Sequence, residues 1–238
     1  MLGLLDEFES ANDEAMSLYL PPGLPQSQVE DLLQKALVPQ AIVQDIAGFA
    51  TSSWTGAVLF WGTTRSYLVL PPFPVTDKYI ATGYDGEPLR SQLEANLSIA
   101  LVLVRLGAFT IGVCQGEKLV TSKTGTGLVH ARHKKGGSSQ RRFERHREKQ
   151  VDTFLERVCS HVRQQLEPYA SSLDYVVYGG SRTTIHSLRE HCPFLKKFED
   201  RTLPPLLDIP RPRRSVLEAA IGTVWSCNVT EWLEDHAI

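Results

Sequence analysis

The residues best suited to chemistry lie in one stretch, residues 130–149, which reads HARHKKGGSSQRRFERHREK. It contains eight Lys or Arg, three His and one Gln against two Glu, so it carries a formal charge of +6. The whole chain carries −2, and the remaining residues therefore carry −8. A strongly positive segment on an acidic body is typical of a protein that binds phosphate groups.

Gln140 is the residue of this stretch that could act on a reacting bond. It does not titrate near neutral pH, so it cannot be a general acid or base, but it can donate and accept hydrogen bonds. The flexible backbone at Gly136 and Gly137 can bring amide N–H groups close to an ester or phosphate. Such a loop would catalyse by positioning a water or a sugar hydroxyl. A glutamine before a helix is otherwise an ordinary surface residue.

The charge of the stretch has a simpler explanation, because charge runs are usually solvated helix faces. Glu144 and Glu148 could form ordinary ion pairs with the neighbouring arginines. However, the basic residues begin ten positions before the expected helix start at Arg142 and flank glycines. Phosphate contact is therefore favoured. The sequence shows no helix-turn-helix, zinc or zipper pattern that would favour sequence-specific DNA binding.

The histidines of the stretch permit a second kind of chemistry. His130, His133 and His146 have no carboxylate or cysteine at ligand spacing beside them, so the sequence predicts no metal and no cofactor. Histidines in a basic loop more often contact phosphate or lie in solvent. An acid–base pair of His133 and Glu144 for RNA cleavage stays open as an alternative.

The elements that must position this stretch are clearest in the second half of the chain. Three strands with tight glycine turns predict an antiparallel meander that leads into the basic stretch. A long helix with apolar residues on one face follows it, and Ser215 is expected to cap the last helix. The expected elements are strands 99–104, 108–115, 118–124 and 174–178, helices 142–166, 183–191 and 215–225, and an extended segment 203–212.

The first half predicts strands that alternate with helices of 3.6-residue period. These elements are strands 14–20, 56–62 and 66–70 and helices 29–37 and 39–49. Residues 71–95 are rich in proline and form the expected boundary region. The sequence therefore predicts the α/β fold class with two mixed α/β domains, residues 1–95 and 96–238.

The cysteines and the apolar segments bear on the compartment. Cys114, Cys159, Cys192 and Cys227 are each more than thirty residues apart, which fits no CxxC zinc pattern and favours buried free thiols. The N-terminus lacks the basic region of a signal peptide, and no apolar run is long enough to span a bilayer. We expect a cytoplasmic protein without a membrane partner.

The residues around Gln140 carry a resemblance to a known family. Residues 133–137 (HKKGG), 142–143 (RF) and 147–149 (REK) resemble the Gly-Gly-Gln loop and following helix of eukaryotic and archaeal class I peptide-chain release factors. Weaker similarity extends, in the family's order, through residues 17–23, 56–62, 112–113, 116–119 and 176–181. The resemblance implies that the second domain is a release-factor central domain, a mixed sheet flanked by helices with a protruding Gly-Gly-x-x-Gln loop.

Two departures from that family refine what the resemblance implies. Ser138 stands where those factors have the glutamine, and the Gly-x-x-Gln spacing that ends at Gln140 is similar to the Vms-type release factors of ribosome quality control. The Asn-Ile-Lys-Ser element of stop-codon readers is missing around residues 36–40. The resemblance therefore implies a codon-independent rescue factor, a peptidyl-tRNA hydrolase or an enzyme that cleaves near the tRNA 3′ end. Its catalytic residues would be Gln140, Gly136 and Gly137, with Ser138 as the competitor of Gln140.

The same resemblance implies the partners. They are the ribosome at the peptidyl-transferase centre of the large subunit, peptidyl-tRNA and rRNA, bound by a monomer. The residues expected to bind RNA, with a strong salt dependence, are Arg132, His133, Lys134, Lys135, Arg141, Arg142, Arg145, Arg147 and Lys149. Two other functions stay open, a non-catalytic ribosome-binding or RNA-binding module similar to Pelota and an RNA endonuclease that depends on His133.

Overall fold

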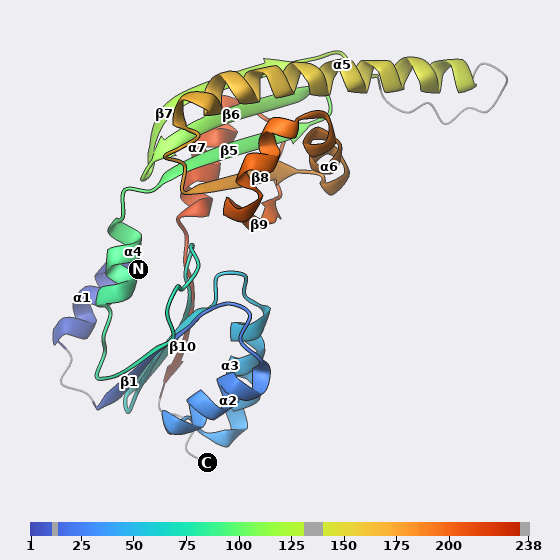
Figure 1. The fold of residues 1–238 in the computed structure, drawn as a ribbon. Coiled ribbons are helices and arrows are strands. Elements are labelled where there is room, and N and C mark those ends of the chain that lie inside the picture. The colour runs from blue at the N-terminus through green and yellow to red at the C-terminus, as the bar shows by residue number, and fades with distance from the viewer. Residues whose placement is uncertain (11–13, 131–139, 234–238) are drawn as a thin grey trace. The chain divides into compact units, whose positions relative to one another are not determined.

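The computed structural model describes residues 1–10, 14–130 and 140–233, which form two compact units. Unit 1 comprises Met1–Ala95 and Val224–Ile238, and unit 2 comprises Asn96–Thr223. Each unit contains a five-stranded sheet flanked by helices, so the predicted α/β class is confirmed (Figure 1).

The sheet of unit 1 has the strand order β10-β3-β2-β1-β4, and all of its neighbours are antiparallel. Its strands are β1 (Ala15–Leu20), β2 (Ala57–Gly62), β3 (Arg65–Leu70), β4 (Tyr79–Thr82) and β10 (Asn228–Leu233). Because successive side chains alternate between faces, Leu18 packs on one side and Tyr19 on the other. Helices α2 (Gln26–Lys35) and α3 (Gln40–Ser52) cover the Leu18 face. Helices α1 (Leu2–Ser10) and α4 (Glu87–Glu94) cover the Tyr19 face.

Strand β10 changes the predicted division of the chain. The predicted second domain, residues 96–238, included this strand, but β10 pairs antiparallel with β3, from Asn228 opposite Leu70 to Leu233 opposite Arg65. Its backbone hydrogen bonds are therefore made in the sheet of unit 1, where residues 224–238 lie. A local sequence pattern does not reveal the partner of a strand so distant along the chain.

The sheet of unit 2 has the order β7-β6-β5-β8-β9. Its strands are β5 (Ser98–Arg105), β6 (Ala108–Gln115), β7 (Lys118–Thr126), β8 (Tyr175–Gly180) and β9 (Thr202–Leu207). Strands β5, β6 and β7 form the predicted antiparallel meander, whereas β8 pairs parallel with β5, and β9 parallel with β8. Strands β5, β7, β8 and β9 therefore run in one direction, and their C-terminal ends lie at one edge of the sheet, here called the C-terminal edge.

Helices cover both faces of this sheet. Helix α5 (Gln140–Leu166) buries the apolar residues Phe154, Leu155, Val158 and Val162 against one face, together with α6 (Arg182–His191) and the 3-10 segment η2 (Pro193–Arg201). A shorter 3-10 turn, η1 (Glu167–Tyr169), follows α5. Helix α7 (Arg214–Val224) covers the other face, where Gly112 leaves room for it, since a Cβ there would lie 2.7 Å from Cδ2 of Leu217. Figure 1 shows the start of α5 extending past the sheet.

Two details of unit 2 differ from the sequence analysis. Helix α7 begins at Arg214, and the carbonyl oxygen of Arg213 accepts hydrogen bonds from the N–H groups of Val216 and Leu217. Ser215 therefore lies inside the first turn and is not the cap. Cys159 in α5 and Cys192 after α6 form a disulfide, whereas free thiols were expected.

Candidate functional site

Much of the predicted site falls outside the described residues. This applies to Gly136, Gly137 and Ser138 among the catalytic candidates, and to Arg132, His133, Lys134 and Lys135 among the RNA-binding candidates. Gln140 and Arg141 are the first two residues of α5. The structure therefore defines the two positions between which the loop 131–139 is attached, His130 and Gln140.

A series of hydrogen bonds fixes the chain that enters this loop against α5. Arg157 Nη1 donates to the carbonyl oxygen of Thr126, 3.1 Å away, at the end of β7. Four residues further on, the N–H of His130 donates to Gln150 Oε1 at 3.1 Å, and Arg147 Nε donates to the His130 carbonyl oxygen at 3.0 Å. Side chains of α5 thus bond to both backbone groups of His130, and we call this arrangement the His130 clasp.

The clasp gives Arg147 a second role beside the predicted contact with RNA. Its side chain is half-buried and bonded to the backbone, unlike its neighbours Arg142, Arg145 and Lys149, which are exposed. Gln150 was not singled out in the sequence. Its spacing of twenty residues from His130 gives no local signal, and only the fold brings the two together.

The exposed cations lie near the N-terminal end of α5, where a positive charge is electrostatically unfavourable. The first N–H groups of a helix carry a partial positive charge, so nearby cations raise the electrostatic energy and nearby anions lower it. The first turn of α5 contains no acidic residue and includes Arg141 and Arg142. An anion bound there would satisfy both the helix end and the arginines, which is the arrangement of a phosphate-binding surface.

Two observations on the described residues concern thiol and metal chemistry. Burial raises the pKa of the Cys114 thiol to about 11, so at neutral pH it is not the reactive thiolate. Within the described residues, no group of three His, Cys, Asp or Glu side chains could hold a metal ion. Of the alternative acid–base pair, Glu144 lies exposed on α5, whereas His133 lies outside the described residues.

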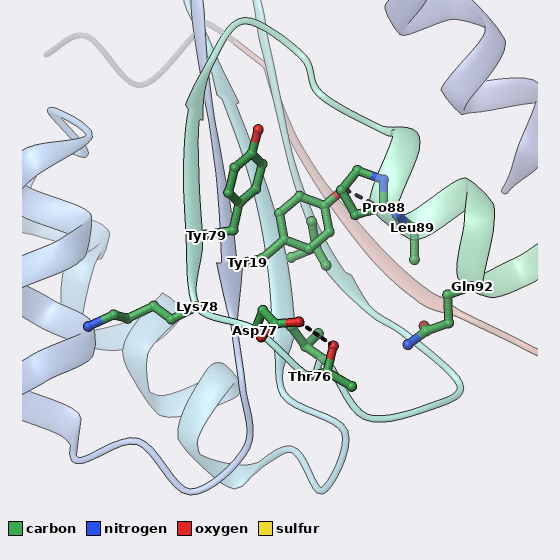
Figure 2. A pocket seen from close by; sticks show the side chains of 10 residues that line it. Tyr19, Thr76, Asp77, Lys78, Tyr79, Pro88, Leu89 and Gln92 are labelled. Carbon is green, nitrogen blue, oxygen red and sulfur yellow. Dashed lines mark hydrogen bonds between the residues drawn. The ribbon is translucent and has the colours of Figure 1, made fainter. Parts of the chain in front are cut away.

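Unit 1 contains a pocket of about 270 Å³ on the Tyr19 face of its sheet, shown in Figure 2. The Tyr19 hydroxyl donates to the carbonyl oxygen of Asp85 and accepts from the N–H of Leu89. Burial raises the pKa of Tyr19 above its ordinary value, so the phenol stays neutral. Gln92 Nε2 donates to the Pro74 carbonyl oxygen at 3.0 Å, and its buried Oε1 has no partner within the described residues. Tyr19 and Gln92 thus offer this pocket apolar contact and a hydrogen-bond acceptor.

No helix in the part of the chain that the structure describes has both the length and the apolar character needed to cross a membrane.

Comparison with known proteins assigns the chain to the translation release factors. Residues 98–230, more than half of the chain, match the acVLRF1 family, described as the Actinobacteria/chloroflexi VLRF1 release factor. The chain belongs to this family, and the predicted relationship to release factors is confirmed.

Individual relatives extend over more of the chain. Peptide chain release factor subunit 1 of Aeropyrum pernix is 31% identical over 184 residues, which are 65% of this chain and 48% of the relative. The crystal structure of the archaeal termination factor aRF1 has a TM-score of 0.43 at 24% identity, covering 94% of this chain and 68% of the other. The Vms1 mitochondrial localization core has a TM-score of 0.43 at 13% identity, covering 79% of each chain. The chain spans about half the length of its first curated relative, and family membership rests on residues 98–230.

Proposed function

We propose that this protein is a codon-independent release factor that frees nascent chains from peptidyl-tRNA on stalled ribosomes or on their large subunits. The observation that carries the proposal is the exposed, arginine-rich start of α5, which begins at Gln140 and has no acidic residue in its first turn. Membership of a release-factor family supports it, because a factor of this kind must approach the densely charged phosphates of RNA.

In this proposal the loop supplies position and not proton transfer. Gln140, with the backbone N–H groups of Gly136 and Gly137, orients the nucleophile and stabilises the developing negative charge. Ser138 takes the place of Gln140 if the loop is aligned without a shift. The nucleophile is a water that attacks the peptidyl ester, or a ribose hydroxyl that attacks the adjacent phosphate and releases the peptide with a tRNA 3′ fragment.

The basic residues supply affinity. Arg142, Arg145 and Lys149 are exposed along the start of α5 and contact phosphates of tRNA or rRNA. Arg132, His133, Lys134, Lys135 and Arg141 act beside them, and Arg147 contributes mainly by holding His130. The proposed partners are peptidyl-tRNA and the rRNA of the peptidyl-transferase centre, and the proposed place of action is the cytoplasm.

The test uses stalled ribosome–nascent-chain complexes with intact peptidyl-tRNA, to which purified wild-type protein or a variant is added. We expect wild type to release the peptide and Gln140→Ala to be slower by about 100-fold or more, as for the loss of a positioned hydrogen-bond donor. Gln115→Ala is the matched control, because Gln115 is an exposed glutamine at the opposite edge of the unit 2 sheet. The state of the tRNA 3′ end distinguishes ester hydrolysis from tRNA cleavage.

Two results would contradict the proposal. Ribosome binding without release by wild type would favour the non-catalytic, Pelota-like function. Cleavage of free tRNA that survives Gln140→Ala but not His133→Ala would favour the endonuclease.

A further inference from the structure

A second group of arginines lies at the C-terminal edge of the unit 2 sheet. Arg182 stands two residues after the end of β8, and Arg211 and Arg213 follow β9 in the segment that leads to α7. All three side chains are exposed. Within the described part of the chain, none of them forms an ion pair. These three arginines, whose charges no described residue neutralises in an ion pair, are here called the second arginine patch.

Strand direction places this patch at the same edge as the basic stretch. His130, the first residue of the basic stretch, follows β7, and the second arginine patch follows β8 and β9, all of which end at the C-terminal edge. Neighbouring strands lie about 4.8 Å apart, so the four steps from β7 to β9 span about 20 Å. The second arginine patch and His130 thus follow strands that end at the same edge, although more than thirty residues separate the end of the basic stretch from Arg182 in sequence.

Two other arginines of unit 2, Arg105 and Arg214, form ion pairs with acidic residues. Arg105, the last residue of β5, forms an ion pair with Asp208 at 3.0 Å, and Arg214 pairs with Glu218 at 2.9 Å. Asp208 and Glu218 are thus paired with other arginines, whereas Arg182, Arg211 and Arg213 form no ion pair with a described residue. Neither α6 nor α7 has an acidic residue in its first turn, so the starts of these helices add to the positive potential.

We propose that Arg182, Arg211 and Arg213 form a second RNA-binding surface, which contacts the sugar–phosphate backbone beside the segment engaged by α5. Arginine suits this role because its guanidinium group forms bidentate hydrogen bonds with phosphate. The contacts are to the backbone and carry no sequence information, so they orient the factor on its RNA. This inference rests on the proposed function for the identity of the RNA as ribosomal RNA or tRNA.

The experiment compares charge reversal at the patch with charge reversal elsewhere on unit 2. The test variant is Arg211→Glu with Arg213→Glu, and the control is Lys118→Glu with Lys196→Glu, which changes the net charge equally. Lys118 is exposed at the start of β7, at the opposite edge, and Lys196 is exposed in η2. Binding of the full chain to purified large ribosomal subunits is measured at several salt concentrations, and thermal unfolding confirms that each variant folds.

We expect the arginine variant to lose about 10-fold or more in affinity, as for lost hydrogen bonds to a charged group. The slope of log affinity against log salt should fall in magnitude by about 2, one for each lost phosphate contact. The lysine control should keep the affinity and slope of wild type. Equal affinities and slopes for the arginine variant and wild type would overturn the inference, as would an equal loss in the control.

Peptide release by the same samples separates this inference from the proposed function. If wild type releases peptide and the arginine variant binds as wild type does, the proposed function stands and the second surface is wrong. If wild type releases no peptide but binds large subunits more tightly than the arginine variant, the second surface stands and the proposed function fails.

Discussion

The two halves of α5 belong to one helix but differ in almost every physical property. Residues 151–166, the packed half, place Phe154, Val158 and Val162 in the core of unit 2 with 3% exposure or less. Residues 140–150, the projecting half, run past the sheet, and Phe143 there is 60% exposed. A helix of 27 residues can support both, because its packed half fixes the direction of the other. Substitutions in the two halves should therefore separate stability from RNA binding.

The largest effect on stability is expected from a core residue of the packed half. Leu155 is fully buried, and Leu155→Ala should lower the free energy of unfolding by about 2–5 kcal/mol, through lost burial and the cavity that remains. Denaturant unfolding measures it. Arg145→Ala, in the projecting half, is the control and should stay within about 0.5 kcal/mol of wild type. Similar losses in the two variants would contradict the division of the helix.

The disulfide should also stabilise the packed half of α5. Cys159 in the packed half is bonded to Cys192, and the pair closes a loop across a sequence separation of 33. Replacing both by alanine should lower the free energy of unfolding by about 2–4 kcal/mol. Reducing agent should lower the thermal midpoint of wild type but leave that of the double variant unchanged. If reducing agent lowered the thermal midpoint of wild type and of the double variant equally, the Cys159–Cys192 bond would not be the cause of the decrease.

Substitutions in the projecting half of α5 should weaken RNA binding without lowering stability. Arg142→Ala with Arg145→Ala should weaken binding to large ribosomal subunits by about 10- to 100-fold and reduce the salt slope by about 2. Stability should stay the same or rise by about 0.3–1 kcal/mol, because a cation leaves the positive end of a helix. Binding and unfolding are measured on the same samples. The control is Lys118→Ala with Lys123→Ala on β7, which removes the same amount of positive charge. An equal loss of binding in the control would mean that net charge, and not the position of the arginines, determines the affinity.

The sequence predicted those elements whose residue pattern is periodic over a short range. The apolar positions of α5 and the glycine turns of the β5–β7 meander gave their elements correctly, because helix period and hairpin turns act within a few residues. Strand β4 and helix α4 lie in the proline-rich segment that was taken as a boundary. The pairing of β10 with β3, like the Cys159–Cys192 bond, depends on contacts between distant segments, which local periodicity does not encode.

The candidate site shows the same limit. Its charge and its glutamine were evident from the sequence, since eight basic residues fall within one stretch of twenty. The His130 clasp was not, because it joins the segment after β7 to the third turn of α5, with His130 and Gln150 twenty residues apart. The second arginine patch was also missed, because only the common direction of β7, β8 and β9 brings it to the same edge as His130.

The smallest predicted effect tests whether the clasp matters for function or only for folding. Gln150→Ala removes the acceptor of the His130 N–H and should cost about 0.5–1.5 kcal/mol of stability. Gln165 is a matched control in the packed half, where its Oε1 accepts from the Thr121 hydroxyl at 2.8 Å, so Gln165→Ala should cost a similar amount. If the clasp positions the loop, Gln150→Ala should slow peptide release several-fold at saturating protein, and Gln165→Ala should not. The affinity of Gln150→Ala for large subunits should stay unchanged. Equal release rates for the two variants would mean that the bond to His130 stabilises the fold and does nothing more.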